Sequence, residues 1–269
     1  MYGYESYVAL GDSFTEGLND QLPDGTFRGW ADRLAEILAG DKPGFQYANL
    51  ALRGKMLAEI VDEQVPVALE LKPDLVTLCA GGNDVIVPGT DVDEIAAQLD
   101  TVVGALTGAG IDVLLFNGPD TKQLSVMNVL RGKIGIYNTH LWAIASRYGA
   151  RVVDLWAMTV LRDHRAWSDD RLHFTPEGHR RIALRAADLL GVPNTETWRE
   201  PWPELADHPD WITMRRSDLA WTRMHLLPWI RRHLRGESMG DGLSPKRPQL
   251  APLIAMQQTA PDDDRAPAT

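Results

Sequence analysis

The 269-residue chain has little cysteine, no long apolar run and no excess of positive charge. Its single cysteine, Cys79, excludes an internal disulfide, and its apolar neighbours in 75–78 predict a buried strand thiol. Without 18 uninterrupted apolar residues, a membrane-spanning helix is not expected. The formal net charge of −10 makes nucleic acid a poor partner. No basic segment or apolar run precedes the first predicted strand, so we expect a cytoplasmic location rather than export.

What the sequence does contain is a regular alternation of short apolar runs and amphipathic stretches. The apolar runs have strand length and occupy 7–10, 47–52, 75–80, 113–116 and 152–155. Segments such as 30–38 and 95–106 have apolar residues at helical spacing. This alternation predicts an α/β fold, in which helices cover both faces of a five-stranded parallel sheet.

The end of this body is marked by a helix signal and then by a change of composition. Thr175 is a candidate N-cap before Pro176, and Gly191 follows the last apolar residues of the helix. We therefore expect one α/β domain over 1–193, a Trp/Arg-rich helical extension over 194–236 and a flexible tail over 237–269, which is rich in Gly, Pro and Asp.

A hydroxyl follows the first predicted strand, in the segment 11–17, which reads Gly-Asp-Ser-Phe-Thr-Glu-Gly. Ligands of parallel sheets bind beyond the carboxyl ends of the strands, so Ser13 is a candidate nucleophile there. The glycines permit close backbone approach, and the first N–H groups of a following helix are unpaired donors. An ordinary N-capping serine is the alternative.

Two further segments follow strands at the same edge. Arg53-Gly54 comes after the second strand, and Gly81-Gly82-Asn83-Asp84 comes after the third. The N–H groups of Ser13 and Gly54 and the side-chain amide of Asn83 are candidate donors to an oxyanion formed beside Ser13. A loop glycine and a turn-forming asparagine are the alternatives.

A base for the serine is offered by Asp170-Arg171-Leu172-His173, just before the last helix. A spacing of three residues in a turn can bring a carboxylate to one imidazole nitrogen and leave the other nitrogen free to face Ser13. Asp169 is a second candidate for the carboxylate.

Together, Gly11-Asp12-Ser13, Gly54, Gly81-Gly82-Asn83-Asp84 and Asp170 to His173 resemble the four sequence blocks of the SGNH hydrolase superfamily, also called GDSL esterases and lipases. The resemblance covers about 5–191 and implies a flavodoxin-like three-layer fold. It also implies metal-free ester hydrolysis with Ser13 as nucleophile, Asp170 and His173 completing a triad, and Gly54 and Asn83 completing the oxyanion hole. Phe14 departs from the leucine that is usual in the family, which should alter local packing rather than the chemistry.

The sequence therefore predicts a serine esterase that forms an acyl-enzyme on a small-molecule ester. Short acyl or acetyl groups are the expected substrates, because the body lacks a long apolar lid. An acyltransferase with the same triad and a non-catalytic module that binds a glycan or an ester are the alternatives.

Other motifs are set aside by their context. The pattern Gly-Glu-Ser-Met-Gly around Ser238 fits a nucleophile elbow, but no strand precedes it and no histidine follows it. Neither a phosphate-binding glycine loop nor a metal-ligand cluster is present, so no cofactor and no metal are expected.

The extension has its own character. Five of the nine tryptophans fall in 198–229, and the segment 211–235 carries six arginines against one acid. We expect a basic amphipathic helix, which either packs its tryptophans on the acidic body, forms a lid or acyl-binding wall, or contacts an acidic lipid surface or a second copy of the chain.

Overall fold

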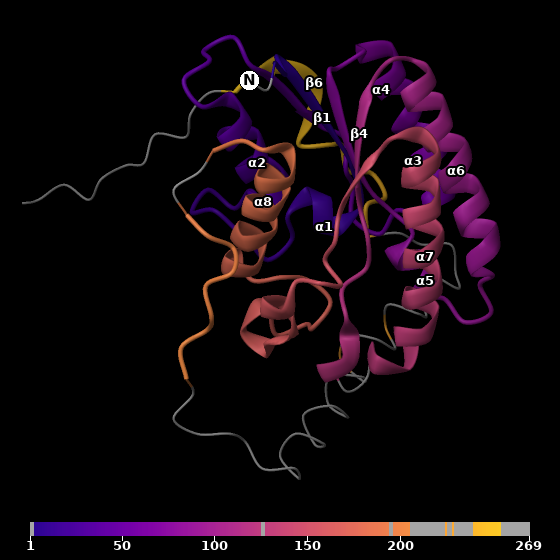
Figure 1. The fold of residues 1–269 in the computed structure, drawn as a ribbon. Helices are drawn as coiled ribbons and strands as arrows, with labels where there is room; N and C mark the ends of the chain where they lie inside the picture. Colours follow the sequence, from indigo (N-terminus) through magenta and orange to yellow (C-terminus); the bar gives the residue numbers. More distant parts are fainter. Residues whose placement is uncertain are drawn as a thin grey trace, which may run out of the picture.

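The computed structural model describes residues 3–124, 127–193, 196–204 and 239–253, together with Met224 and Pro228. Figure 1 shows a central sheet with helices on both sides. The strands are β1 (Ser6–Gly11), β2 (Gln46–Asn49), β3 (Leu75–Cys79), β4 (Asp112–Phe116), β5 (Arg151–Val153) and β6 (Arg247–Pro252). The α-helices are α1 (Ser13–Glu16), α2 (Gly29–Ala39), α3 (Leu57–Glu63), α4 (Val65–Leu71), α5 (Gly82–Ile86), α6 (Val92–Gly108), α7 (Arg131–Tyr148) and α8 (Pro176–Leu190).

The sheet has the strand order β5-β4-β3-β1-β2-β6. The first five strands in the chain are parallel, and β6 is antiparallel to β2. β1 lies between β2 and β3, and the chain order reverses at this point. The loops after β1, β2, β3 and β4 therefore meet at one edge, which is the topological switch point where open α/β sheets bind ligands.

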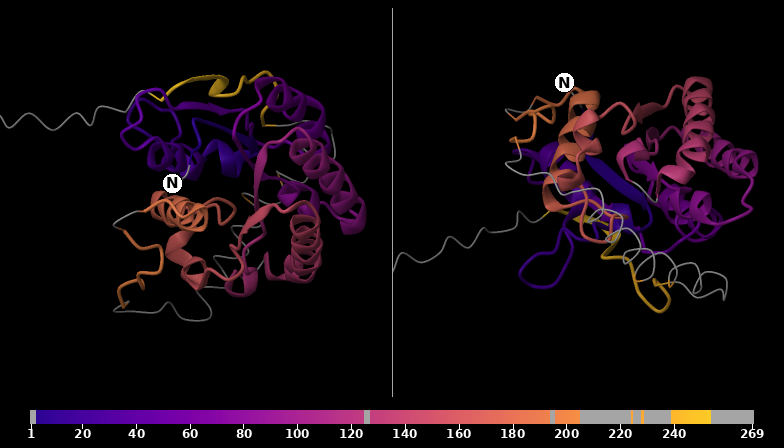
Figure 2. Two further views of the ribbon diagram at one scale, coloured as in Figure 1. Left: turned by 45° about the horizontal axis from the view of Figure 1, so that its top comes forward. Right: turned by 90° about the horizontal axis from the view of Figure 1, so that it is seen from below.

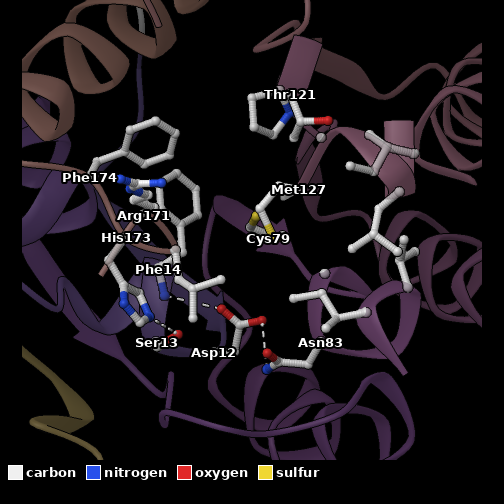
Figure 3. A pocket seen from close by; sticks show the side chains of 18 of the residues that line it. Asp12, Ser13, Phe14, Cys79, Asn83, Thr121, Met127, Arg171, His173 and Phe174 are labelled. Carbon is white, nitrogen blue, oxygen red and sulfur yellow. Dashed lines mark hydrogen bonds between the residues drawn. The ribbon is translucent and has the colours of Figure 1, made fainter. Parts of the chain in front are cut away.

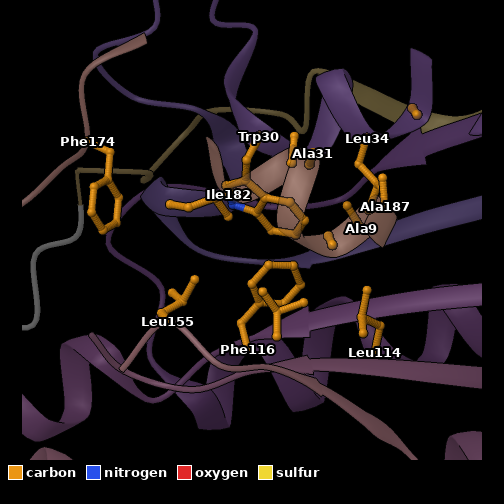
Figure 4. Close-up of a cluster of buried hydrophobic side chains, with 14 of the residues drawn as sticks. Ala9, Trp30, Ala31, Leu34, Leu114, Phe116, Leu155, Phe174, Ile182 and Ala187 are labelled. Carbon is orange, nitrogen blue, oxygen red and sulfur yellow. The ribbon is translucent and has the colours of Figure 1, made fainter. Parts of the chain in front are cut away.

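Two apolar layers lie against the two faces of this sheet. Tyr7 and Ala9 of β1 belong to the cluster that includes α2 and α8, whereas Val8 and Leu10 belong to the cluster that includes α3, α6 and α7. This alternation follows from the two-residue period of a strand. Figure 2 shows the helices on both sides, and Figure 4 shows side chains of the α2/α8 layer around Trp30 and Phe116. All the core residues of β1 and β3 are nearly or fully buried, which explains their uninterrupted apolar runs.

The predicted three-layer α/β fold with five parallel strands is thus confirmed. The second strand ends earlier than expected, because the chain leaves the sheet after Asn49. The helix predicted from the Thr175 N-cap is observed: Thr175 Oγ1 accepts from the Gly178 N–H at 3.3 Å, and Gly191 has a positive φ of 68°.

A sixth strand was not expected. β6 lies within the segment that was predicted to be a flexible tail, so that prediction does not hold for Arg247–Pro252. The strand is short of apolar residues and contains two prolines, which are tolerated at the edge of a sheet. The strand pairs with β2, and the part-buried side chain just before it contacts the body. The Nζ of Lys246 lies 2.9 Å from Asp32 Oδ2 and donates to the carbonyls of Phe27 and Arg28.

The start of the extension packs on the body. Trp202 donates from Nε1 to the carbonyl of Val160 at 2.8 Å, and the Arg181 guanidinium lies 4.4 Å from the centre of its indole ring. The predicted basic helix over 211–235 lies outside the described residues except for Met224 and Pro228, and so does Ser238. No helix in the described ranges is long and apolar enough to cross a membrane.

We predict that Lys246→Met lowers the free energy of unfolding by about 3 kcal/mol, because it leaves the buried Asp32 carboxylate without its cation. The change should be measured by urea denaturation. Lys42→Met is the matched control: its ammonium lies 3.8 Å from Glu5 and its side chain is 39% exposed, so we expect a loss under about 1 kcal/mol. Equal losses in the two variants would show that Lys246 does not anchor β6.

Candidate active site

The candidate nucleophile lies at the turn between β1 and α1. Asp12 caps α1, with its Oδ1 accepting from the Phe14 N–H at 3.1 Å, and Ser13 is the first residue of the helix. Gly11 allows the tight packing under this turn, since a Cβ there would lie 2.6 Å from the Cys79 carbonyl. The local sequence therefore presents the Ser13 hydroxyl at the carboxyl end of the central strand.

His173 lies directly beside that hydroxyl. Its Nε2 is 2.8 Å from Ser13 Oγ, and its Nδ1 is 2.7 Å from Asp170 Oδ2. Figure 3 shows the contact between His173 and Ser13. The structure thus brings the three residues of the predicted triad into one hydrogen-bonded chain, although 160 positions separate Ser13 from His173.

The Asp170 carboxylate has more donors than the triad requires. Its Oδ1 accepts from the backbone N–H groups of Leu172 and His173 and from Ser168 Oγ. Its Oδ2 accepts from Asn19 Nδ2 at 2.7 Å, in addition to the bond with His173. Burial alone would raise the pKa of Asp170, but the bond and charge of His173 and these backbone donors hold it well below its ordinary value. The ionised carboxylate can only accept, so Nδ1 of His173 carries the proton and Nε2 faces Ser13 as an acceptor.

A backbone turn makes this arrangement possible. Arg171 has a φ of 50°, in the left-handed region that residues other than glycine seldom adopt. The turn folds the chain back so that the Asp170 side chain meets the N–H groups of Leu172 and His173. Asp169, the other candidate for the carboxylate, is exposed.

The two other predicted donors, Asn83 and Gly54, line the same pocket as Ser13. Asn83, in the first turn of α5, donates from Nδ2 to the Lys55 carbonyl at 2.9 Å and to Asp12 Oδ2 at 3.3 Å. Gly54 precedes Lys55, has a φ of 80°, which favours glycine, and lines the same pocket as Ser13 and Asn83. Asn83 therefore holds the Gly54 loop against α5.

Two acidic groups border this region: Asp12 is buried, whereas Cys79, predicted to be buried, is only partly so and lines the pocket. Burial raises the pKa of Asp12 to about 6, against the bond from the Phe14 N–H. Burial, followed by the charge of Asp12, raises the pKa of the Cys79 thiol well above its ordinary value. Cys79 ends β3, as predicted, and its thiol stays protonated at neutral pH, which makes it a poor nucleophile.

A pocket of about 490 Å³ opens beside Ser13 and His173. The sequence did not predict it, because its walls come from many separate segments, including the loops after β3 and β4 and the short 3-10 turns before α7. Met224, Pro228 and Met239 of the C-terminal region also line it. Its lining is mostly apolar, with Phe14, Ile86, Phe116, Leu124, Met127 and Phe174 among its members.

A second histidine lies behind the site. His179 is fully buried; its Nδ1 accepts from the Trp30 N–H and its Nε2 donates to the Leu18 carbonyl. Its ring stacks on Phe14 at 5.8 Å between ring centres. Both nitrogens of the neutral ring thus have a hydrogen-bond partner, and burial lowers the pKa of His179 to about 4.

This burial predicts a pH dependence of stability. The unfolded state binds a proton at His179 near pH 6.5 and the folded state only near pH 4, so the free energy of unfolding falls as the pH decreases through this window. We expect His179→Asn to be less stable than the parent protein at neutral pH. Across this pH window, however, its free energy of unfolding should fall by about 3 kcal/mol less than that of the parent protein. Urea denaturation at a series of pH values measures this.

The comparison isolates His179, because Asp12, whose raised pKa acts with the opposite sign, is present in both proteins. His140→Asn is the control, since His140 is 40% exposed and paired with Asp93. Parallel stability curves for the parent protein and His179→Asn would contradict the prediction.

No metal site accompanies these groups in the part of the chain that the structure describes: no cluster of three or more His, Cys, Asp or Glu side chains is placed to hold an ion.

Short segments of the chain resemble curated proteins of another kind. Pyridoxine 5'-phosphate synthase from Synechococcus sp. (strain JA-2-3B'a(2-13)) is 38% identical over 96 residues, which are 35% of this chain and 40% of that protein. The same enzyme from Trichodesmium erythraeum is 33% identical over 104 residues, or 38% and 42% of the two chains. The chain thus spans about two-fifths of the length of these relatives, which does not carry their activity over to it.

Solved structures share the fold over most of the chain. A catalytic mutant of an acetylxylan esterase from Geobacillus stearothermophilus has 20% identity and a TM-score of 0.61, covering 73% of this chain and 96% of that one. The lipase/acylhydrolase from Enterococcus faecalis has 20% identity and a TM-score of 0.56, covering 70% and 96%. At these identities the likeness shows the fold alone.

The family is shown by a match along the sequence. The model of the GDSL-like Lipase/Acylhydrolase family matches residues 9–181, a span that contains Ser13, Gly54, Asn83, Asp170 and His173. The chain therefore belongs to the GDSL-like lipase/acylhydrolase family, whose members hydrolyse ester bonds.

Proposed function

We propose that the protein is a serine esterase in which Ser13 is the nucleophile, His173 the general base and Asp170 the residue that orients the imidazole. The hydrogen-bonded chain from Ser13 Oγ through His173 to Asp170 carries this proposal. The family and the pocket beside Ser13 support it, because a nucleophile needs both a base and a space for its substrate.

In the first step, His173 Nε2 takes the proton of Ser13 while Oγ forms a bond to the ester carbonyl carbon. The carbonyl electron pair moves to the oxygen and gives a tetrahedral oxyanion. When this collapses, the bond to the alcohol oxygen breaks, and the proton on Nε2 goes to the leaving alcohol. Water then attacks the acyl-enzyme by the same route and releases the acid. Asp170 stabilises the imidazolium throughout without accepting its proton.

The oxyanion would be held by the N–H groups of Ser13 and Gly54 and by Asn83. Both Nδ2 hydrogens of Asn83 have partners in this structure, but the bond to Asp12 is long, at 3.3 Å. An oxyanion next to Ser13 competes with Asp12 for this hydrogen, whereas the shorter bond to Lys55 keeps the amide in place. Donors preset in this way stabilise the transition state more than the ground state.

The assignment is tested with a fluorophosphonate probe and a chromogenic ester. We expect the parent protein to be labelled and Ser13→Ala to lose both labelling and turnover, with kcat/KM reduced about 10,000-fold or more. Ser238→Ala, which changes the nucleophile-elbow pattern instead, should keep both. Folded parent protein that is not labelled, or labelled Ser13→Ala, would overturn the proposal and favour a binding module.

The donors to Asp170 predict a second effect on the rate. Asn19→Gly removes the Asn19 amide but tolerates the positive φ of 68° at this position. With one donor fewer, Asp170 holds the imidazole less firmly, and we expect kcat to fall about fivefold to tenfold with little change in KM.

Steady-state kinetics measures this effect, and Asn19→Asp is a second variant that should show a larger one. A carboxylate at position 19 repels the ionised Asp170, so Asn19→Asp should be slower than Asn19→Gly. If both variants keep the parental kcat, Asn19 does not position Asp170.

A further inference from the structure

The loop after β2 contains one N–H group that is left open. Every other N–H of 53–57 has an acceptor, and in chain order these acceptors are Glu16, the Leu52 carbonyl, Glu59 and Asp84. Among the residues that the structure describes, none accepts from the Gly54 N–H, and Gly54 lines the pocket beside Ser13. A donor that stays open in a loop otherwise bonded is available to an oxygen that becomes negative in the pocket.

This donor has to be fixed relative to the nucleophile. The Ser13 N–H belongs to the first residue of α1, whereas Gly54 lies in the loop after β2, and both must face one oxygen to stabilise it. Donors of this kind contribute about 100-fold to 1000-fold each, and a misplacement of about 1 Å can lose about 100-fold in rate. A contact that connects the two segments therefore bears directly on the rate.

The side chain of Glu16 makes this connection. Glu16 lies one helical turn after Ser13 on α1 and is 6% exposed. Its Oε2 accepts from the backbone N–H of Arg53 at 2.8 Å, both of its oxygens lie 3.1 Å from Arg53 Nε, and its Oε1 also accepts from Nη2. A carboxylate that binds a planar guanidinium through two oxygens fixes its orientation as well as its distance. Because Arg53 directly precedes Gly54, these bonds hold the peptide that carries the open N–H.

The same loop is held from two further directions. The guanidinium of Arg53 lies 5.1 Å from the centre of the Phe27 ring, in a cation–π contact. On the other side of Gly54, Asn83 donates to the Lys55 carbonyl at 2.9 Å. Both residues that flank Gly54 are thus fixed, Arg53 to α1 through Glu16 and Lys55 to α5 through Asn83.

We propose that Glu16 is a positioning residue of the reaction: through Arg53 it holds the open N–H of Gly54 where this group and the Ser13 N–H donate to the same oxyanion. The inference rests on the proposed function, because the oxyanion forms only when Ser13 attacks an ester. Neither Glu16 nor Arg53 is among the described residues that line the pocket, so their effect is on the rate of acyl transfer rather than on contacts with the substrate.

Two variants of Glu16 test this role with p-nitrophenyl acetate. In Glu16→Gln the amide oxygen can still accept from the Arg53 N–H, but the charge and the second acceptor for the guanidinium are lost. In Glu16→Ala all of these bonds are lost. We expect kcat/KM to fall about fivefold to twentyfold in Glu16→Gln and about 30-fold to 100-fold in Glu16→Ala. Glu36→Ala is the control, because Glu36 binds Arg28 through both oxygens on α2 and should leave the rate unchanged.

The matching thionoester, p-nitrophenyl thionoacetate, separates positioning from a structural effect. Its sulfur takes the negative charge of the tetrahedral intermediate, and sulfur is a weak acceptor of hydrogen bonds. A misplaced Gly54 N–H should therefore lower the rate with the thionoester by less than about threefold in both variants, so that the ratio of the oxygen ester rate to the thionoester rate falls. Asn83→Ala, which removes another of the proposed oxyanion donors, should lower this ratio in the same way.

The outcomes separate the two proposals. Equal losses with the two esters would show that Glu16 has only a structural role, and parental rates in both variants would show that it has none; either result overturns the inference while the esterase proposal stands. Turnover that persists in Ser13→Ala would overturn the esterase proposal itself. Thermal melts show which variants are folded, and if Glu16→Ala does not fold, the ester ratio of Glu16→Gln decides.

Discussion

The polar groups of this site act together only if one imidazole ring is held between two fixed partners. Ser13 is attached to the central strand and Asp170 to the turn before α8, and His173 bridges them with hydrogen bonds of 2.8 and 2.7 Å. Because β1 is parallel to β2 and β3, the loops that carry Ser13, Gly54 and Asn83 leave the sheet at the same edge. The sheet fixes the position of Ser13, and the left-handed turn at Arg171 fixes the position of His173 relative to Asp170.

Much of this arrangement could be predicted from the sequence. Strands that are buried on both faces show as continuous apolar runs, and the residues after the first three strands pointed to Ser13, Gly54 and Asn83. His173 was predicted from its place just before the last helix, three residues after Asp170. α7 gave a weaker signal, since only five of its 18 residues are buried and the large apolar side chains of Ile136 and Trp142 are exposed. β6 could not be recognised from its own residues, because a distant carboxylate, Asp32, anchors it through Lys246.

The pocket was even harder to predict from the sequence than β6. The expectation of short acyl groups rested on the absence of a long apolar lid in the body, and it stays a prediction. Residues from Asp12 to Met239 line the pocket, and most of them come singly or in pairs from separate loops and turns. No window of the sequence contains enough of these residues to show a pattern. Asn19 was missed for this reason, since its bond to Asp170 joins groups that are distant in the chain.

Phe14 connects the chemistry to the pocket. The family usually has a leucine at this position, and the sequence suggested only a local change of packing. In the structure, the Phe14 ring lies within 6.4 Å of the ring centres of Trp30, Phe116, Phe174 and His179. It also lines the pocket, directly after the nucleophile. A flat ring supported on several sides gives this wall a fixed shape. The neutral, buried His179 belongs to that support, so the group expected to lower the stability in acid also packs behind this wall of the pocket.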